Sequence, residues 1–261
     1  MKDCVIYTSL TGGYDPLMQA AVVDEDFDYI CFSNDFQEKR IGIWEIRPVP
    51  FLHPDALVLS RYAKLQPHML LPEYSHSVWM DANIRIVGKN FYDLVRAQIE
   101  AGTLAAHINH VHENRDCIYD EIETCLRYGK ISLGDALTQY THLRKNHYPR
   151  HQGLFENNLV FRRHNDPLIR KFSDCWWTEF LKYARRDQFS LNYIYWKEGF
   201  TPELLLPPDK CARNVPYLEY VRHPKETAAP RLLDKYRTKV SRPAAYAAYK
   251  LLTAVQDACW K

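Results

Sequence analysis

Short apolar runs bounded by polar or proline-containing segments recur through most of the chain and alternate with stretches of helical periodicity. The runs that predict strands cover residues 4–9, 29–33, 44–49 and 77–87. The stretches that predict helices cover the first part of 59–68 and residues 91–101, 120–128, 133–144 and 167–183. Strands separated by helices favour an α/β fold with a mostly parallel central sheet flanked by helices.

The pattern changes after residue 202, where prolines and short polar loops interrupt it. Residues 231–250 contain a single acidic residue, Asp234, against six basic ones: Arg231, Lys235, Arg237, Lys239, Arg242 and Lys250. Residues 245–259 then predict a helix. We therefore expect one domain over residues 1–227 and a basic helical C-terminal tail over 228–261. Such a tail is either a solvated terminal helix or a contact to an anionic membrane face.

Composition narrows the class of protein. The 261 residues suffice for one large domain, and a net charge of +2 with 25% charged residues argues against a nucleic-acid binder with a broadly basic surface. The seven cysteines include no C-x-x-C pair, which favours reduced thiols over disulfides or a zinc ribbon. The first residues lack the apolar region of a signal peptide, so we expect a cytoplasmic protein, at most peripheral at the inner membrane face.

Polar side chains interrupt the predicted strand 77–87 at Asp81 and Asn83. Alternate residues of a strand share a face, so both side chains are expected to reach one ligand. Carboxylate and amide oxygens suit Mg²⁺ or Mn²⁺, which leaves positions for phosphate groups. Asp81 and Asn83 are therefore the candidate metal ligands, although an amide oxygen holds a cation more weakly than a carboxylate. A polar turn that ends the strand is the alternative.

Two further segments predict contacts to a phosphorylated ligand. Gly12 and Gly13 follow the first strand, where a glycine pair lets the backbone approach a nucleotide or simply makes a tight turn. Arg61 and Lys64 lie three residues apart on one helix face, just before the Asp81 strand. Two cations on one face can hold a pyrophosphate, and a solvated helix face is the alternative.

A second group of polar residues predicts a sugar-binding wall. Glu156, Asn157 and Asn158 stand just before an apolar strand, and their carboxylate and amide groups suit sugar hydroxyls. Asp187 and Gln188 open an aromatic-rich helical stretch, where charge is unfavourable unless it is paired or functional.

Three histidines, His107, His110 and His112, raise the alternative of a zinc-dependent hydrolase. Their spacing matches neither H-E-x-x-H nor a zinc finger, so a polar loop that lines a substrate pocket is the preferred interpretation.

The segments that carry a family resemblance occur in one order along residues 3–200: Tyr7-Thr8, Gly12-Gly13-Tyr14-Asp15, Cys31-Phe32, Arg61 with Lys64, Trp79-Met80-Asp81-Ala82-Asn83, Glu156-Asn157-Asn158, Trp176-Trp177-Thr178-Glu179 and Arg186-Asp187-Gln188. Together they resemble the glycosyltransferase-like family once classed as a domain of unknown function, which includes plant mucilage-related proteins and bacterial enzymes from capsule or O-antigen clusters. The Asp81 segment itself resembles the Asp-x-Asp motif of nucleotide-sugar glycosyltransferases.

The resemblance implies a GT-A fold and sugar transfer from a nucleotide-diphosphate donor, with a divalent cation (Mn²⁺ or Mg²⁺), to a saccharide or lipid-linked saccharide acceptor. Surface polysaccharide synthesis is the expected process, with no nucleic acid as partner. The residues expected to bind the donor are Tyr7, Thr8, Gly12, Gly13, Tyr14, Arg61, Lys64, Asn157, Asn158 and Gln188. The candidate catalytic carboxylates are Asp187, as the base of an inverting reaction or a ligand of the donor sugar in a retaining one, and Glu156. A non-catalytic carbohydrate- or nucleotide-sugar-binding protein on the same fold is the alternative.

Overall fold

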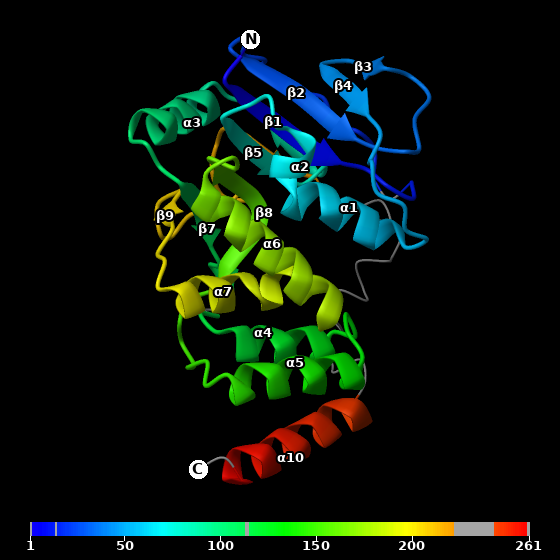
Figure 1. Cartoon of the computed structure of the whole chain (residues 1–261), viewed down its shortest axis with the longest axis vertical. Coiled ribbons are helices and arrows are strands. Elements are labelled where there is room, and N and C mark those ends of the chain that lie inside the picture. The colour runs from blue at the N-terminus through cyan, green and yellow to red at the C-terminus, as the bar shows by residue number, and fades with distance from the viewer. Residues whose placement is uncertain (1, 14, 113–114, 222–242, 260–261) are drawn as a thin grey trace.

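The computed structural model describes residues 2–13, 15–112, 115–221 and 243–259 (Figure 1). The strands are β1 Cys4–Ser9, β2 Phe27–Phe32, β3 Arg40–Ile41, β4 Trp44–Arg47, β5 His76–Met80, β6 Ile84–Ile86, β7 Ala105–Asn109, β8 Phe155–Arg162, β9 Glu203–Leu204 and β10 Leu218–Tyr220. The helices are α1 Ala56–Leu65, α2 Pro67–Leu70, α3 Asn90–Glu100, α4 Ile118–Arg127, α5 Leu133–Lys145, α6 Pro167–Lys182, the 3₁₀ turn η2 Asp187–Phe189, α7 Leu191–Glu198 and α10 Pro243–Cys259.

The central sheet has eight strands in the order β3-β4-β2-β1-β5-β8-β7-β9. Four of its seven pairings are parallel, namely β2 with β4, β1 with β2, β1 with β5, and β7 with β9. The remaining three, β3 with β4, β5 with β8, and β7 with β8, are antiparallel. The predicted α/β class with a mostly parallel sheet is confirmed.

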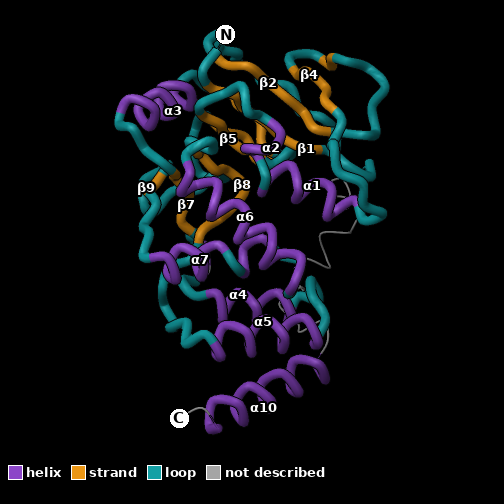
Figure 2. The backbone as a smooth tube through the Cα atoms, viewed as in Figure 1, coloured by secondary structure: helices purple, strands orange, loops and turns teal. Residues whose placement is uncertain are grey.

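Helices cover both faces of this sheet because alternate side chains of its buried strands point to opposite sides. On β1, Cys4 and Ile6 pack with α3, whereas Val5 and Tyr7 pack with α1 and α2. A third cluster of buried residues joins α4, α5, α6 and α7 beyond the sheet. Figure 2 shows the resulting division, with strands gathered toward the N-terminus and α4, α5 and α10 at the opposite end.

The structure corrects the predicted strand 77–87. β5 ends at Met80, and a turn closed by a hydrogen bond from the Ile84 amide to the Asp81 carbonyl (2.9 Å) separates it from β6. β6 pairs with β10 in a separate two-stranded sheet. The prediction that Asp81 and Asn83 share one strand face was therefore wrong, because the polar turn redirects the chain between them.

Two other predictions of local structure are also corrected. Glu156, Asn157 and Asn158 lie inside β8 rather than before it. Asp187 lies in the 3₁₀ turn η2 ahead of α7 rather than in an α-helix.

The C-terminal helix α10 is present and packs on α4 and α5. Residues 222–242, which include the proposed boundary at residue 228 and the first part of the predicted basic tail, residues 228–242, lie outside the described residues. Within the described ranges, the helices are too short or too polar to cross a membrane.

Candidate active site

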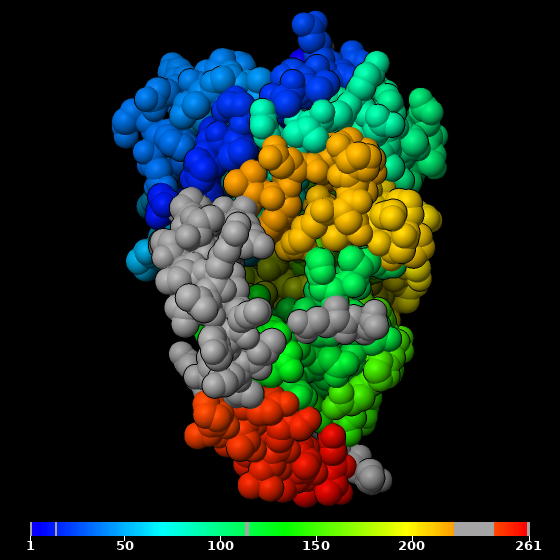
Figure 3. All heavy atoms as spheres, turned by 180° about the vertical axis from the view of Figure 1, so that it is seen from behind, coloured from blue at the N-terminus to red at the C-terminus, as the bar shows by residue number. Residues whose placement is uncertain are grey.

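A cavity of about 450 Å³ opens at the carboxyl end of β5. Ligands of open α/β sheets bind at this end of the strands, because the loops that follow them converge there. Six basic residues line the cavity: Arg61, Lys64, Arg115, Lys130, Arg186 and Arg213. Four carboxylates line it as well: Asp81, Glu121, Glu156 and Asp187. Figure 3 shows a recess on the back of the molecule, bordered by the orange segment before residue 222 and the green segment near residue 112.

The charges of this wall favour an anionic ligand. Six cations against four carboxylates leave two positive charges when the histidines are neutral. A low-dielectric cleft strengthens the field of such a surplus and attracts ligands of opposite sign. A group with about two negative charges, such as a diphosphate ester, would balance the cavity.

Lys64 is the centre of the ion-pair network at the Asp81 end. Its side chain is only 2% exposed, and its Nζ lies 2.6 Å from Oδ2 of Asp187 and 3.5 Å from Oδ1 of Asp81. Trp79 donates its indole N–H to the same Asp81 oxygen at 2.7 Å. α1, β5 and η2 therefore meet at one buried ammonium group, which explains why charged residues occur amid apolar positions in the sequence.

Asp187 is ionised in this arrangement. Burial alone would raise the pKa of the Asp187 carboxyl group. The positive charges of Lys64 and Arg61 lower this pKa by more than burial raises it, so it lies well below its usual range. Arg61 Nε lies 3.4 Å from Oδ1 of Asp187. A carboxylate with such a low pKa is a fixed negative charge and a weak proton acceptor.

The two predicted metal ligands face different surroundings. Asp81 lines the cavity, and its Oδ2 has no hydrogen-bond donor among the described residues. Asn83 is 4% exposed and donates its amide N–H to the Val221 carbonyl at 3.0 Å. Its amide oxygen Oδ1 accepts no hydrogen bond from the described residues. A carboxylate oxygen and an amide oxygen are ligand types that a hard divalent cation accepts. Asn83 does not line the cavity, however, because the turn at residues 81–83 points it toward Val221.

An irregularity in β8 brings three consecutive polar residues to the cavity. His107 pairs with Val160, but the next residue of β7, Ile108, pairs with Glu156, so β8 contains extra residues between these points. Such a bulge turns side chains away from strict alternation. Glu156, Asn157 and Asn158 consequently all line the cavity, although a regular strand would direct Asn157 to the other side.

The amide groups of this bulge lack hydrogen-bond partners. Asn157 is 6% exposed, and both its amide nitrogen and its amide oxygen are unpaired among the described residues. Oδ1 of Asn158 is unpaired in the same sense, whereas its amide nitrogen donates to Glu156 at 3.0 Å. Buried polar groups without partners are unfavourable by about 1–3 kcal/mol each, so a ligand rich in hydroxyl groups would satisfy them.

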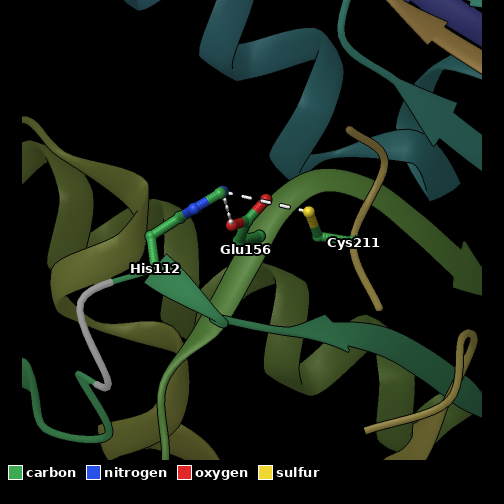
Figure 4. A group of neighbouring side chains, drawn as sticks. All are labelled: His112, Glu156 and Cys211. Atoms are coloured by element: carbon green, nitrogen blue, oxygen red, sulfur yellow. Dashed lines mark hydrogen bonds and ion pairs between the residues drawn. The ribbon is translucent and has the colours of Figure 1, made fainter. Parts of the chain in front are cut away.

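Glu156 is surrounded by donors and by a candidate metal-binding group. Figure 4 shows His112, Glu156 and Cys211 converging, with His112 Nε2 lying 3.3 Å from Oε1 of Glu156 and 3.9 Å from Sγ of Cys211. These three residue types could hold a divalent ion. The guanidinium of Arg213, however, lies 3.0 Å from both His112 Nε2 and Glu156 Oε2 and already supplies positive charge between them.

The three histidines of the sequence have different positions. His110 and His112 line the cavity, as the polar-loop interpretation predicts. His107 does not, because it lies in β7, is fully buried, and its Nε2 is 2.8 Å from the Tyr195 hydroxyl. A zinc site made of all three histidines is therefore not formed.

The residues predicted to hold the nucleoside lie partly in the core. Tyr7 is fully buried, and Arg162 donates to its hydroxyl at 2.6 Å. Thr8 is 1% exposed. Neither side chain lines the cavity, so their assignment as donor-binding residues is not supported, because β1 is the central strand and both of its faces are covered.

The glycine pair after β1 stays at the surface. Gly12 and Gly13 are exposed and have φ angles of +71° and +58°. A Cβ on Gly12 would lie 2.9 Å from the Ala56 side chain, so both its backbone conformation and its space require glycine. The pair follows β1 at the same sheet edge as Asp81 but does not line the cavity. Tyr14 lies outside the described residues.

The other predicted residues are brought together. Arg61, Lys64, Asp81, Glu156, Asn157, Asn158, Asp187 and Gln188 all line one cavity. The sequence interpretation missed several further lining residues, namely Arg115, Glu121, Tyr128, Lys130 and Arg213. They lie in or next to α4 and in a late loop, and no local pattern marks them, because only the tertiary fold carries them to this site.

Comparisons with known proteins find one family model and several similar solved structures. A family model described as TOD1/MUCI70, glycosyltransferase-like domain matches residues 19–213. No curated protein matches the chain in sequence. Among solved structures, apo mouse xyloside xylosyltransferase 1 is similar over 83% of this chain and 96% of its own, with 9% identity and a TM-score of 0.47. The apo bifunctional glycosyltransferase WbbM is similar over 82% of this chain and 42% of its own, with 13% identity and a TM-score of 0.40.

Proposed function

Because the chain belongs to the TOD1/MUCI70 glycosyltransferase-like family, we propose that it transfers a sugar from a nucleotide-diphosphate donor to a saccharide or lipid-linked saccharide, in surface polysaccharide synthesis. The observation that carries this proposal is the pairing of two features in one cavity. The unpaired amides of Asn157 and Asn158 suit sugar hydroxyls, and the surplus of positive charge suits a diphosphate.

Each part of the donor has a proposed place. Arg61 and Lys64 lie next to the diphosphate and stabilise the negative charge that develops on the leaving group. Asn157, Asn158 and the amide oxygen of Gln188, whose nitrogen donates to the Phe155 carbonyl, hold sugar hydroxyls. The exposed turn at Gly12 and Gly13, on the same sheet edge, is the proposed contact for the nucleoside.

A divalent cation, Mn²⁺ or Mg²⁺, would be held by the cavity-facing carboxylate of Asp81 and would supply further positive charge to the diphosphate, whereas Asn83 lies off the cavity wall. Lys64 already provides one positive charge beside Asp81, so the side chains of the chain itself contribute part of this neutralisation.

The two candidate catalytic carboxylates have different proposed roles. Asp187 is a poor base because Lys64 and Arg61 hold its pKa low, and we assign it the role of orienting these two cations. Glu156 is the better candidate to accept the proton of an acceptor hydroxyl, because it lines the cavity and its Oε1 accepts no hydrogen bond from the described residues.

The proposal is tested by measuring donor binding and turnover. Nucleotide-diphosphate sugars are screened by thermal shift with and without Mn²⁺, since a ligand that binds only the folded state raises the melting temperature. We expect one donor class to raise it, and Asn157→Ala to weaken that donor by about tenfold or more, the loss of one or two buried hydrogen bonds. Asn146→Ala, at the exposed end of α5, is the matched control and should bind like the wild type.

Turnover separates an enzyme from a binding protein. Asp81→Ala should abolish release of the nucleoside diphosphate while the protein remains folded, because Asp81 is one-third exposed and lies in a turn. Donor binding by the wild type without any release of product would instead favour the non-catalytic carbohydrate- or nucleotide-sugar-binding alternative. The position of Asn83 off the cavity wall is the observation that favours this alternative, because it removes one of the two predicted metal ligands from the site. If no nucleotide sugar shifts the melting temperature, both sugar transfer from such a donor and the binding of nucleotide sugars are wrong.

A further inference from the structure

The C-terminal helix α10 packs with its polar side inward. Tyr249 and Thr253 are 2% and 7% exposed, and Asp257 accepts a hydrogen bond from Tyr140 of α5 at 2.6 Å. Tyr246 donates to Glu123 of α4 at 2.5 Å, and Gln256 to Thr141 of α5 at 3.0 Å. These contacts fix the rotation of α10 about its own axis, so its opposite side must face outward.

The outward side is mostly apolar. Lys250 is exposed on this helix, together with six apolar residues, namely Ala247, Leu251, Leu252, Ala254, Val255 and Ala258. Residues three and four apart share one side of a helix, so these six form a continuous apolar face. The two charged residues of α10 do not interrupt it, because Lys250 pairs with Glu123 and Asp257 with Arg144.

This arrangement is the reverse of a helix that faces water. A surface helix of a soluble domain buries its apolar stripe and exposes its polar side. Among the described residues, nine large hydrophobic side chains are exposed. Three of them, Leu251, Leu252 and Val255, lie together on α10, and the other six are spread over two loops and the helices α1, α2 and α6. Exposed apolar surface that is gathered in one place marks a contact to a partner or a membrane.

The charge of the adjoining sequence identifies the kind of partner. Residues 231–242 lead into α10 and contain five arginines and lysines against one aspartate. The structure of this segment lies outside the described residues. Positive charge beside an apolar helix face is the combination that binds anionic lipid bilayers, since lipid headgroups attract the cations and the acyl boundary takes up the apolar face.

We propose that the outward face of α10, formed by Ala247, Leu251, Leu252, Ala254, Val255 and Ala258, docks on the surface of an anionic lipid bilayer. α10 lies at the end of the molecule away from the N-terminal strands, so this contact would hold the protein by its helical end and leave the sheet facing away from the lipid (Figure 1). The inference does not depend on sugar transfer, because it rests on the exposed face and on the basic sequence that precedes α10.

The test is sedimentation of the full chain with vesicles. Wild-type protein should bind vesicles of phosphatidylglycerol and phosphatidylcholine at least about tenfold more tightly than vesicles of phosphatidylcholine alone. The triple variant Leu251→Ser, Leu252→Ser, Val255→Ser should lose binding to the anionic vesicles by about tenfold or more, because the polar side chains no longer favour burial at the acyl boundary. Its melting temperature should not change, since all three side chains are exposed in the folded protein.

A double variant, Leu52→Ser with Met69→Ser, is the matched control, because these residues are 93% and 60% exposed but lie far along the chain from α10. It should bind vesicles like the wild type. Three outcomes would overturn the proposal: no binding of the wild type to anionic vesicles, equal binding to neutral vesicles, or full binding by the triple variant. A wild-type dimer in light scattering that becomes a monomer in the triple variant, without vesicle binding by either, would assign the face to a second copy of the chain instead.

Discussion

At the scale of single residues, the buried pair of Lys64 and Asp187 organises the site. The two side chains are 2% and 11% exposed and their charged atoms are 2.6 Å apart. Removing one member of a buried pair leaves the other charge without compensation, which is far less favourable than removing both. The pair therefore has a structural and a functional role that can be measured separately.

We predict that Asp187→Asn lowers the free energy of unfolding by about 3 kcal/mol and kcat by about 100-fold, because Lys64 then stays buried without a full negative partner. The double variant Lys64→Met, Asp187→Leu should recover most of that stability and remain inactive. Urea unfolding and release of nucleoside diphosphate are the two measurements. An Asp187→Asn protein with unchanged stability and activity would show that the pair is unimportant to both.

At the scale of elements, α10 belongs to the folded domain rather than extending from it. Tyr249 is 2% exposed, and its ring contacts that of Tyr140 edge to face at a centroid distance of 5.9 Å. The sequence suggests either a solvated helix or a membrane contact for this segment. The structure gives α10 an inner side that packs on α4 and α5 and an outer side that is exposed.

We predict that Tyr249→Ala lowers the free energy of unfolding by about 3 kcal/mol, the usual effect of removing a buried aromatic ring. Leu252→Ala, on the outer side of the same helix, should change it by less than about 0.5 kcal/mol. Both are measured by urea unfolding, where the midpoint should move without a change in slope. Equal effects of the two substitutions would mean that α10 does not pack as the structure shows.

At the scale of the whole molecule, buried histidines make the stability depend on pH. Burial, together with the positive charges of Arg162 and Lys64, lowers the pKa of His107 to about 3, and burial lowers that of His164 to about 4. In an unfolded chain both histidines would have a pKa of about 6.5. Between these values the unfolded state binds more protons than the folded state, so stability falls as the pH falls.

We therefore predict that His107 and His164 do not lower the free energy of unfolding above about pH 6.5. At pH 5 each of them should lower it by about 2 kcal/mol. Asp187 adds a further loss in the same direction below about pH 4, because its folded pKa is also lowered. Urea unfolding at pH 7.5, 6 and 5 measures the slope. His107→Gln should reduce the slope by about half, and an unchanged slope would mean that His107 is not the source.

The sequence alone determined much of this protein, because the relevant signals are local. Apolar runs and helical periodicity predicted β1, β2, α3, α5 and α6 to within a few residues. The same reasoning named eight of the residues that line the cavity, since a charge or an amide next to a buried segment is visible without a fold. Connection to a known family was possible for the same reason, because short motifs in a fixed order survive in the linear chain.

The tertiary structure decided everything that depends on neighbours distant in sequence. Whether Tyr7 is a ligand contact or a core residue depends on Arg162, and the direction of Asn83 depends on Val221. Arg213 joins the cavity only because the chain returns there after β9. The composition of α10 likewise indicates a helix with an apolar side, but only its contacts with α4 and α5 decide that this side faces outward. A local pattern reports how favourable burial is for a side chain, whereas the long-range packing of the chain decides which side chains are buried and against what.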